Sequence, residues 1–315
     1  MLPGQKGKTG VTEKKSIYDY VSGEMDVTKE VHKLADLFEI YALIQVHNTH
    51  TTNKKIPLER YVSRFFLKWN GRGSYLTPEE LKQDMGVADI KNKIPNELQT
   101  TLYLEYLLNM IELFEDKEPS YKHQLHKYQP YKYQSQKHQS ISIGTSLYQA
   151  LKDNLSLLLS QLNLKPVQKE QGVFILVPEN PEVTEAVDIV EKSDVKLAIL
   201  EYNHITNREN LAEKQKILHV LAKDFEPRRL ELGQTKEGKT LASDLGFLFN
   251  TLDIRHNNTE GIKAIPAIQN MPKTTLLEWY DITYRTYLTA VLLHDYSSEE
   301  QQAKITALKK AVNPT

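Results

Sequence analysis

The chain contains no cysteine. This absence excludes disulfide bonds, thiolate zinc sites, cysteine-ligated iron–sulfur clusters and cysteine nucleophiles. A chain without disulfides fits a reducing compartment, so we expect a cytoplasmic protein. No stretch approaches about 18 uninterrupted apolar residues, and residues 1–15 contain no apolar run of the secretory type. We therefore expect neither a membrane span nor a secretion signal.

The chain also has few turn-forming residues and no excess of one charge. Its 13 glycines and 13 prolines among 315 residues are too few for a turn-dense β-sandwich. The 40 lysines and arginines balance 41 aspartates and glutamates, which gives a net charge of -1. This balance indicates no strongly charged binding surface, and 40% hydrophobic residues argue against global disorder.

Apolar spacing predicts a mainly α-helical protein. Apolar residues recur at three and four positions along most of the chain, which places them on one face of a helix. The predicted helices are 26–46, 97–114, 147–162, 211–227, 240–257 and 274–296, with shorter ones after Pro57, Thr77 and Pro181. Residues 173–177 are β-branched and aromatic, and a turn at Gly172 pairs them with 164–168. We expect a helical bundle interrupted by one small hairpin near 164–177.

Composition divides the chain into four parts. We expect a flexible arm at residues 1–25, an N-terminal helical region at 26–120, a basic polar linker or loop at 121–140, and a helical domain at 141–315.

Residues 121–140 interleave cations with tyrosine rings, which suits single-stranded nucleic acid. The candidate nucleic-acid-binding residues are Lys122, Lys127, Lys132 and Lys137. The alternative is a solvated linker, which is the commoner role of a polar tract.

The helix at 240–257 carries the most specific pattern in the chain. Its apolar face is formed by Leu241, Leu245, Leu248, Phe249 and Leu252. Continuing the same spacing reaches Arg255 and His256, so two polar groups occupy the last turn at positions where apolar residues are expected.

Two interpretations of Arg255 and His256 remain open. As helix-end cations they complement the helix dipole and pair with a carboxylate such as Asp253, which is the commoner role. As a phosphate-handling site, Arg255 binds phosphoryl oxygens and His256 transfers a proton. Asn250, Asp253 and Asn257 lie on an adjoining face and are candidates to orient the pair.

We predict no metal and no cofactor. His47 and His50 stand three apart, but no acid accompanies them, and the histidines of residues 121–140 lack helical spacing. The sequence contains no phosphate-binding glycine loop, nucleophile elbow, zinc-protease motif or dinucleotide fingerprint.

Residues 245–258, which read LGFLFNTLDIRHNN, resemble the carboxyl-terminal half of abortive-infection-like proteins with a HEPN domain. The resemblance extends over residues 214–231 and 274–296. It implies a helical bundle of bacterial antiphage or toxin systems, in which active members are metal-independent ribonucleases working as dimers. The family signature is an arginine, a polar residue, three to five spacer positions and a histidine. Arg255 and His256 match the first two positions, and residues 257–263 contain no second histidine.

The resemblance implies two functional hypotheses. In the first, the protein binds or cleaves RNA, with Arg255 stabilising charge on the phosphate and His256 acting as acid or base. A homodimer would supply a second copy of both residues. In the second, the protein is a non-catalytic HEPN-like interaction module that acts through dimerisation or an unknown protein partner.

Overall fold

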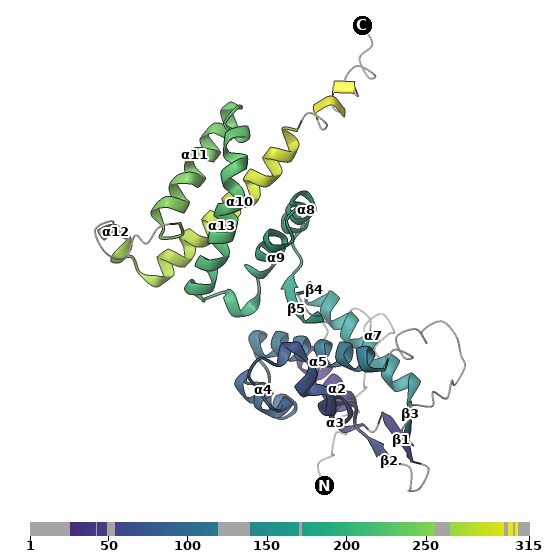
Figure 1. Cartoon of the computed structure of the whole chain (residues 1–315). Coiled ribbons are helices and arrows are strands. Elements are labelled where there is room, and N and C mark those ends of the chain that lie inside the picture. Colours follow the sequence, from purple (N-terminus) through teal and green to yellow (C-terminus); the bar gives the residue numbers. More distant parts are fainter. Residues whose placement is uncertain are drawn as a thin grey trace, which may run out of the picture.

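The computed structural model of the chain describes residues 26–41, 43–48, 54–118, 139–169, 172–255, 265–298, 302–304 and 306–307. Most of these residues are helical, and the strands form two small antiparallel sheets (Figure 1). The predicted mainly helical class is therefore confirmed. The expected arm at 1–25 lies outside the described residues, as do the four candidate lysines of residues 121–140, His256 and Asn257. Among the described helices, none is both long and apolar enough to cross a membrane.

The first hydrophobic core is built around one long helix, α5 (Glu97–Lys117). This helix begins at a capping box formed by Asn96 and Gln99, and most of its faces are buried. The other helices of the first core are α2 (Val27–Ala35), η1 (Asp36–Ile40), α3 (Leu58–Val62), η2 (Ser63–Lys68), η3 (Asn70–Arg72), α4 (Pro78–Asp84), η4 (Ile90–Asn92) and α7 (Thr145–Gln161). The short helix predicted after Thr77 is confirmed as α4, and the Thr77 hydroxyl caps it by accepting a hydrogen bond from the Glu80 backbone N–H.

A three-stranded sheet also belongs to this core. Its strands are β1 (Ile44–Asn48), β2 (Lys54–Ile56) and β3 (Gln139–Ile143), in the order β2-β1-β3. In the register, Ile44 lies opposite both Ile56 and Ile143. The predicted helix at 26–46 is therefore wrong beyond Ile40, and the hairpin is not the only β structure. Ile44 and Val46 are buried on one face of β1, which is the two-residue period of a strand.

The second hydrophobic core is a helical bundle. It comprises α8 (Pro181–Ile189), α9 (Ser193–Glu201), α10 (Leu211–Leu232), α11 (Lys236–Thr251), α12 (Pro266–Gln269) and α13 (Lys273–Tyr296), with η7 (Ile205–Asn207) between α9 and α10. Helix α13 lies against α8, α10 and α11. Helix α10 continues through Pro227, where we predicted its end. The proline removes one backbone hydrogen bond, but the next turn places Leu232 in the core and so preserves the helix.

The predicted hairpin is confirmed as β4 (Leu164–Gln168) and β5 (Phe174–Pro178), and it lies between the two groups of helices (Figure 1). Successive strand residues point to opposite faces of a sheet. Accordingly, Leu176 is buried in the first core, whereas Ile175 and Val177 are buried in the second. One strand thus contributes to both cores.

The side chains of α5 bind the backbone of β5. The Asn109 amide accepts from the Phe174 N–H and donates to the Phe174 carbonyl, both at 2.8 Å. Glu105 accepts from the Leu176 N–H at 2.8 Å and contacts Nε2 of His204 at the same distance. Helix α7, which we assigned to the domain at 141–315, packs instead in the first core. The two cores therefore meet at the hairpin, and the linker predicted at residues 121–140 lies almost wholly outside the described residues.

Candidate functional site

Arg255 follows α11 and does not lie within it. The helix ends at Thr251, Asp253 adopts a left-handed backbone with φ of 62°, and the Arg255 N–H donates to the Phe249 carbonyl at 3.1 Å. Aspartate is among the residues that tolerate this conformation. The predicted placement of Arg255 in the last helical turn is therefore wrong. The chain turns early because Leu252 and Ile254 are both buried, which a continuing helix would not allow.

Residues 252–255, here called the Arg255 turn, are held by side chains of two other helices. Gln215 on α10 donates to the Asp253 carbonyl at 2.5 Å and to its carboxylate at 3.2 Å. Nδ1 of His219, one helical turn further on, lies 3.0 Å from the Ile254 carbonyl. From α13, the Tyr280 hydroxyl donates to the Leu252 carbonyl at 3.3 Å. The backbone of the turn is thereby fixed from two sides.

The guanidinium of Arg255 is fixed as well. Its Nη1 donates to Glu226 on α10 at 2.6 Å and to the side-chain amide oxygen Oδ1 of Asn250 at 3.3 Å. The pair is partly open to solvent, with the Arg255 and Glu226 side chains 28% and 40% exposed. Within the described part of the chain, Nε and Nη2 of Arg255 have no hydrogen-bond partner. Among the described residues, the turn thus presents an oriented cation whose Nε and Nη2 donors are unused.

The structure gathers only some of the residues that the sequence singled out. Asn250 lies beside Arg255 as expected, whereas the Asp253 side chain turns to Gln215. The carboxylate paired with Arg255 is Glu226, which the sequence analysis missed. Glu226 is 29 residues from Arg255 along the chain, and no local spacing connects the two. His256, Asn257, Lys122, Lys127, Lys132 and Lys137 lie outside the described residues, so their predicted roles stay predictions.

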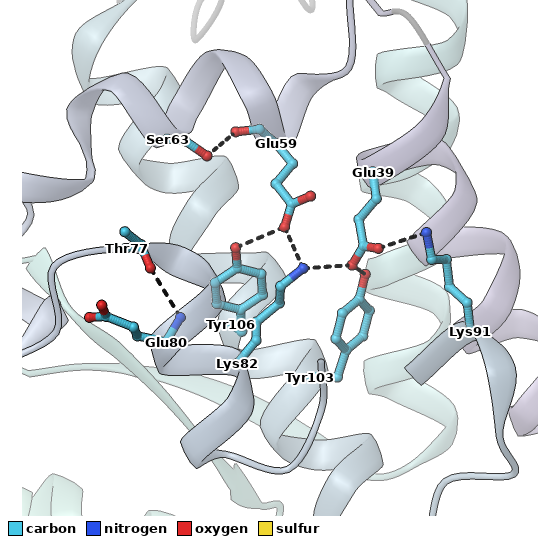
Figure 2. Close-up of polar contacts among 9 residues, drawn as sticks. All are labelled: Glu39, Glu59, Ser63, Thr77, Glu80, Lys82, Lys91, Tyr103 and Tyr106. Atoms are coloured by element: carbon cyan, nitrogen blue, oxygen red, sulfur yellow. Dashed lines mark hydrogen bonds and ion pairs between the residues drawn. The ribbon is translucent and has the colours of Figure 1, made fainter. Parts of the chain in front are cut away.

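A second charged cluster lies in the first core (Figure 2). Lys82 stands between two carboxylates, at 2.6 Å from Glu59 and 3.4 Å from Glu39. The hydroxyl of Tyr106 donates to Glu59 at 3.2 Å, and that of Tyr103 donates to Glu39 at 3.1 Å. Lys91 adds a further contact to Glu39 at 3.0 Å. We call these six residues the Lys82 network.

Burial governs the protonation of the Lys82 network. It raises the pKa of Glu59, and the opposing effect of Lys82 offsets only part of that rise. Burial also disfavours the charge on Lys82, but the two carboxylates outweigh it and raise the pKa of Lys82 above its ordinary value. The pKa values of Tyr103 and Tyr106 are raised well above the ordinary value, chiefly by burial. Both hydroxyls therefore stay protonated at neutral pH.

The Lys82 network serves packing and not ligand binding. The side chains of Lys82, Glu39 and Glu59 are only 8%, 6% and 15% exposed, and each polar group meets partners within the protein. Buried charges are tolerated when they are paired in this way. No sequence signal identified the network, because its members come from separate elements that meet only in the folded chain.

A pocket of about 590 Å³ opens between α9 and α10. Leu197, Ile217 and Val220 are among the apolar residues that line it. Both of its lysines are already paired, Lys169 with Glu201 and Lys216 with Glu213, and Asp194 is the remaining charged residue of the lining. The lining consequently favours no particular class of ligand.

The comparisons with known proteins give no information about the site. No family model, curated protein or solved structure was found to match the chain. Across the residues that the structure describes, no three or more His, Asp or Glu side chains are grouped so as to hold a metal ion. The HEPN resemblance accordingly stays a hypothesis. The Arg255 turn is the candidate site because it combines fixed geometry with exposed donors.

Proposed function

We propose that the protein is a HEPN-like protein of bacterial defence type, active in the cytoplasm, that binds RNA at the Arg255 turn. The observation that supports this proposal is the oriented, partly exposed guanidinium of Arg255, whose Nε and Nη2 have no partner in the described part of the chain. A guanidinium presents its donors as a planar fork, which matches two oxygens of a phosphate. Glu226 and Asn250 hold the fork in one orientation, and this lowers the entropy lost on binding.

The proposed reaction is metal-independent cleavage of the RNA backbone. The ribose 2′-oxygen forms a bond to the adjacent phosphorus, and the bond from phosphorus to the 5′-oxygen breaks. A base accepts the 2′-hydroxyl proton, and an acid protonates the leaving 5′-oxygen. Arg255 stabilises the charge that grows on the phosphate.

The reaction needs two proton-transfer groups, and the sequence offers one histidine near Arg255. We assign one role to His256, which follows Arg255 directly. The carboxylate of Glu226, which contacts Arg255, is our candidate for the other. This assignment places both groups in one copy of the chain.

The test uses a labelled single-stranded RNA with a metal chelator present throughout. We expect Arg255→Ala to weaken RNA binding at least about tenfold and to abolish cleavage, because the phosphate loses its charged donor. Arg208→Ala is the matched control, since Arg208 is also an exposed arginine paired with a glutamate, Glu97. Equal RNA binding by wild type and Arg255→Ala would contradict the proposal.

The non-catalytic interaction module remains the second candidate. It is favoured by the same ion pair, because Glu226 already neutralises Arg255 and so explains the arginine without a ligand. Under this alternative, the wild-type protein neither binds nor cleaves RNA. The same assay therefore separates the two.

A further inference from the structure

Helix α13 has a second, uncharged face on which Trp279, Ile282 and Tyr296 are exposed, whereas Leu293 packs partly against the second core. Its bundle-facing side carries Tyr280, Tyr284, Tyr287 and Val291, all buried. On the opposite side, seven uncharged residues alternate at spacings of four and three. They are Thr275, Trp279, Ile282, Thr286, Thr289, Leu293 and Tyr296. This is the heptad spacing of helices that pair along a seam. We call these seven residues the α13 stripe.

The α13 stripe is suited to burial. At its centre, the large side chains of Trp279 and Ile282 are 38% and 36% exposed. The hydroxyl of Thr286 donates to the Ile282 carbonyl at 2.7 Å, and that of Thr289 donates to the Arg285 carbonyl at 3.0 Å. Both hydroxyls are therefore hydrogen-bonded within their own helix. Covering the stripe would therefore leave neither of them unpaired.

Two opposite charges flank the stripe and suggest what covers it. Glu278 and Arg285 lie on the same edge, seven residues apart, and both are exposed. Within the described residues neither forms an ion pair, and Arg285 donates only to the backbone carbonyl of Asp281. In an antiparallel pair of helices, residues on this edge face the same edge of the partner. A second copy would thus supply the complementary charge.

We propose that the α13 stripe pairs antiparallel with the α13 stripe of a second copy of this chain. With the two-fold axis between Tyr280 and Asp281, Trp279 packs against Ile282 of the partner subunit. Glu278 then faces the partner subunit's Arg285, and the symmetry repeats both contacts. A parallel pair would lack this match, because Glu278 and Arg285 would face the other edge of the partner helix, where Thr283 and Ala290 lie.

This interface is independent of the proposed RNA site. Tyr280, which contacts the Arg255 turn, lies on the bundle-facing side of α13 and therefore away from the stripe. The pairing does not bring the two Arg255 turns into one cleft, in contrast to the composite site expected from the sequence. Dimer formation and RNA binding are thus separable properties.

Sedimentation of the full-length protein with charge-reversed variants tests the interface. We expect wild type to be a dimer, and Glu278→Arg and Arg285→Glu each to weaken it about tenfold, because each places like charges together. The double reversal recreates both ion pairs and should restore the dimer. Ile282→Asp should give a monomer, whereas Phe247→Asp, at an exposed apolar residue of α11, should not.

Circular dichroism of each variant verifies the fold. A monomeric wild type would overturn the proposal, and so would a dimer that the double reversal fails to restore. A dimer that responds as expected but binds no RNA would support this interface while contradicting the proposed function.

Discussion

The Lys82 network and the Arg255 turn are both built from ion pairs, yet they differ in burial and in the hydrogen-bond donors that they leave without a partner. In the network, Lys82 is enclosed by Glu39 and Glu59, and two tyrosine hydroxyls also donate to these carboxylates (Figure 2). In the turn, the Arg255–Glu226 pair is partly exposed, and two guanidinium nitrogens lack partners among the described residues.

The difference separates a structural role from a binding role. A buried charge must be satisfied by the protein itself, because an unpaired one is costly, and a satisfied group has little left for a ligand. A surface pair contributes little to stability and can exchange partners with solvent or a ligand. We therefore expect stability to depend on the network and RNA binding to depend on the turn.

Alkaline pH should have the largest effect, because it titrates the network together with the other buried tyrosines whose pKa burial raises, which are Tyr148, Tyr202, Tyr280, Tyr284 and Tyr287. The pKa values of Lys82, Tyr103 and Tyr106 are raised in the folded protein, so these groups keep protons that the unfolded chain releases above about pH 10. Their stabilising contribution is complete below the unfolded pKa and is lost as pH rises towards the folded one.

The measurement is the free energy of unfolding between about pH 8 and pH 11. We expect a steep fall above about pH 10, with the same slope in wild type and Arg255→Ala. A free energy that stays constant over this range would contradict the account of the network.

Replacing Lys82 should have the next largest effect. Lys82→Met leaves Glu39 and Glu59 buried beside each other without the shared cation, which we expect to cost about 3–5 kcal/mol. Lys91→Met is the control, because Lys91 is more exposed and contacts only Glu39, so its loss should cost about 1 kcal/mol or less. Urea unfolding measures both. Equal losses in the two variants would show that burial does not determine the energetics of this network.

The junction between the cores should show an intermediate effect. Asn109→Leu removes both hydrogen bonds to Phe174 and leaves a partly buried N–H and carbonyl without these partners, at a cost of about 1–3 kcal/mol. Asn270→Ala, at an exposed asparagine that bonds only within its own segment, should be nearly neutral. Calorimetry is the measurement. A loss no larger than that of the control would mean that α5 does not hold the hairpin through these bonds.

The smallest effect on stability is expected at the Arg255 turn. Arg255→Ala should lower the free energy of unfolding by about 1 kcal/mol or less, because the pair with Glu226 is partly exposed. A double-mutant cycle with Glu226→Gln measures the pair directly. A loss near that of Lys82→Met would instead place Arg255 with the structural pairs and favour the non-catalytic alternative.

Local spacing predicted the parts of the fold that local contacts determine. Helices α5, α7 and α13 bury faces whose residues recur within one or two turns, and the hairpin strands are close in sequence. Strand β1 escaped prediction because one partner, β2, is close in sequence but only 3 residues long, and the other, β3, lies almost a hundred residues away. The assignment of α7 to the second group of helices was wrong for the same reason. Nothing in the sequence near residues 121–140 shows which core the leucines of α7 pack into.

The candidate site was predictable to a similar degree. Asn250 and Arg255 are near in sequence, so their association followed from spacing. The end of α11 did not, because the left-handed residue at Asp253 depends on burying both Leu252 and Ile254. Glu226 reaches the turn only through the packing of α10, and the Lys82 network likewise needs the whole first core. The sequence pattern therefore did not predict polar pairs between residues that lie far apart in the chain.

The most direct test of the central claim compares RNA affinity and stability in the same two variants. Fluorescence anisotropy with a labelled single-stranded RNA and chelator should show tight binding by Lys82→Met, assayed where it remains folded, and at least about tenfold weaker binding by Arg255→Ala. The unfolding free energies should follow the opposite order, with the larger loss in Lys82→Met. If Arg255→Ala binds RNA as well as wild type, or if wild type does not bind, the Arg255 turn is not the functional site.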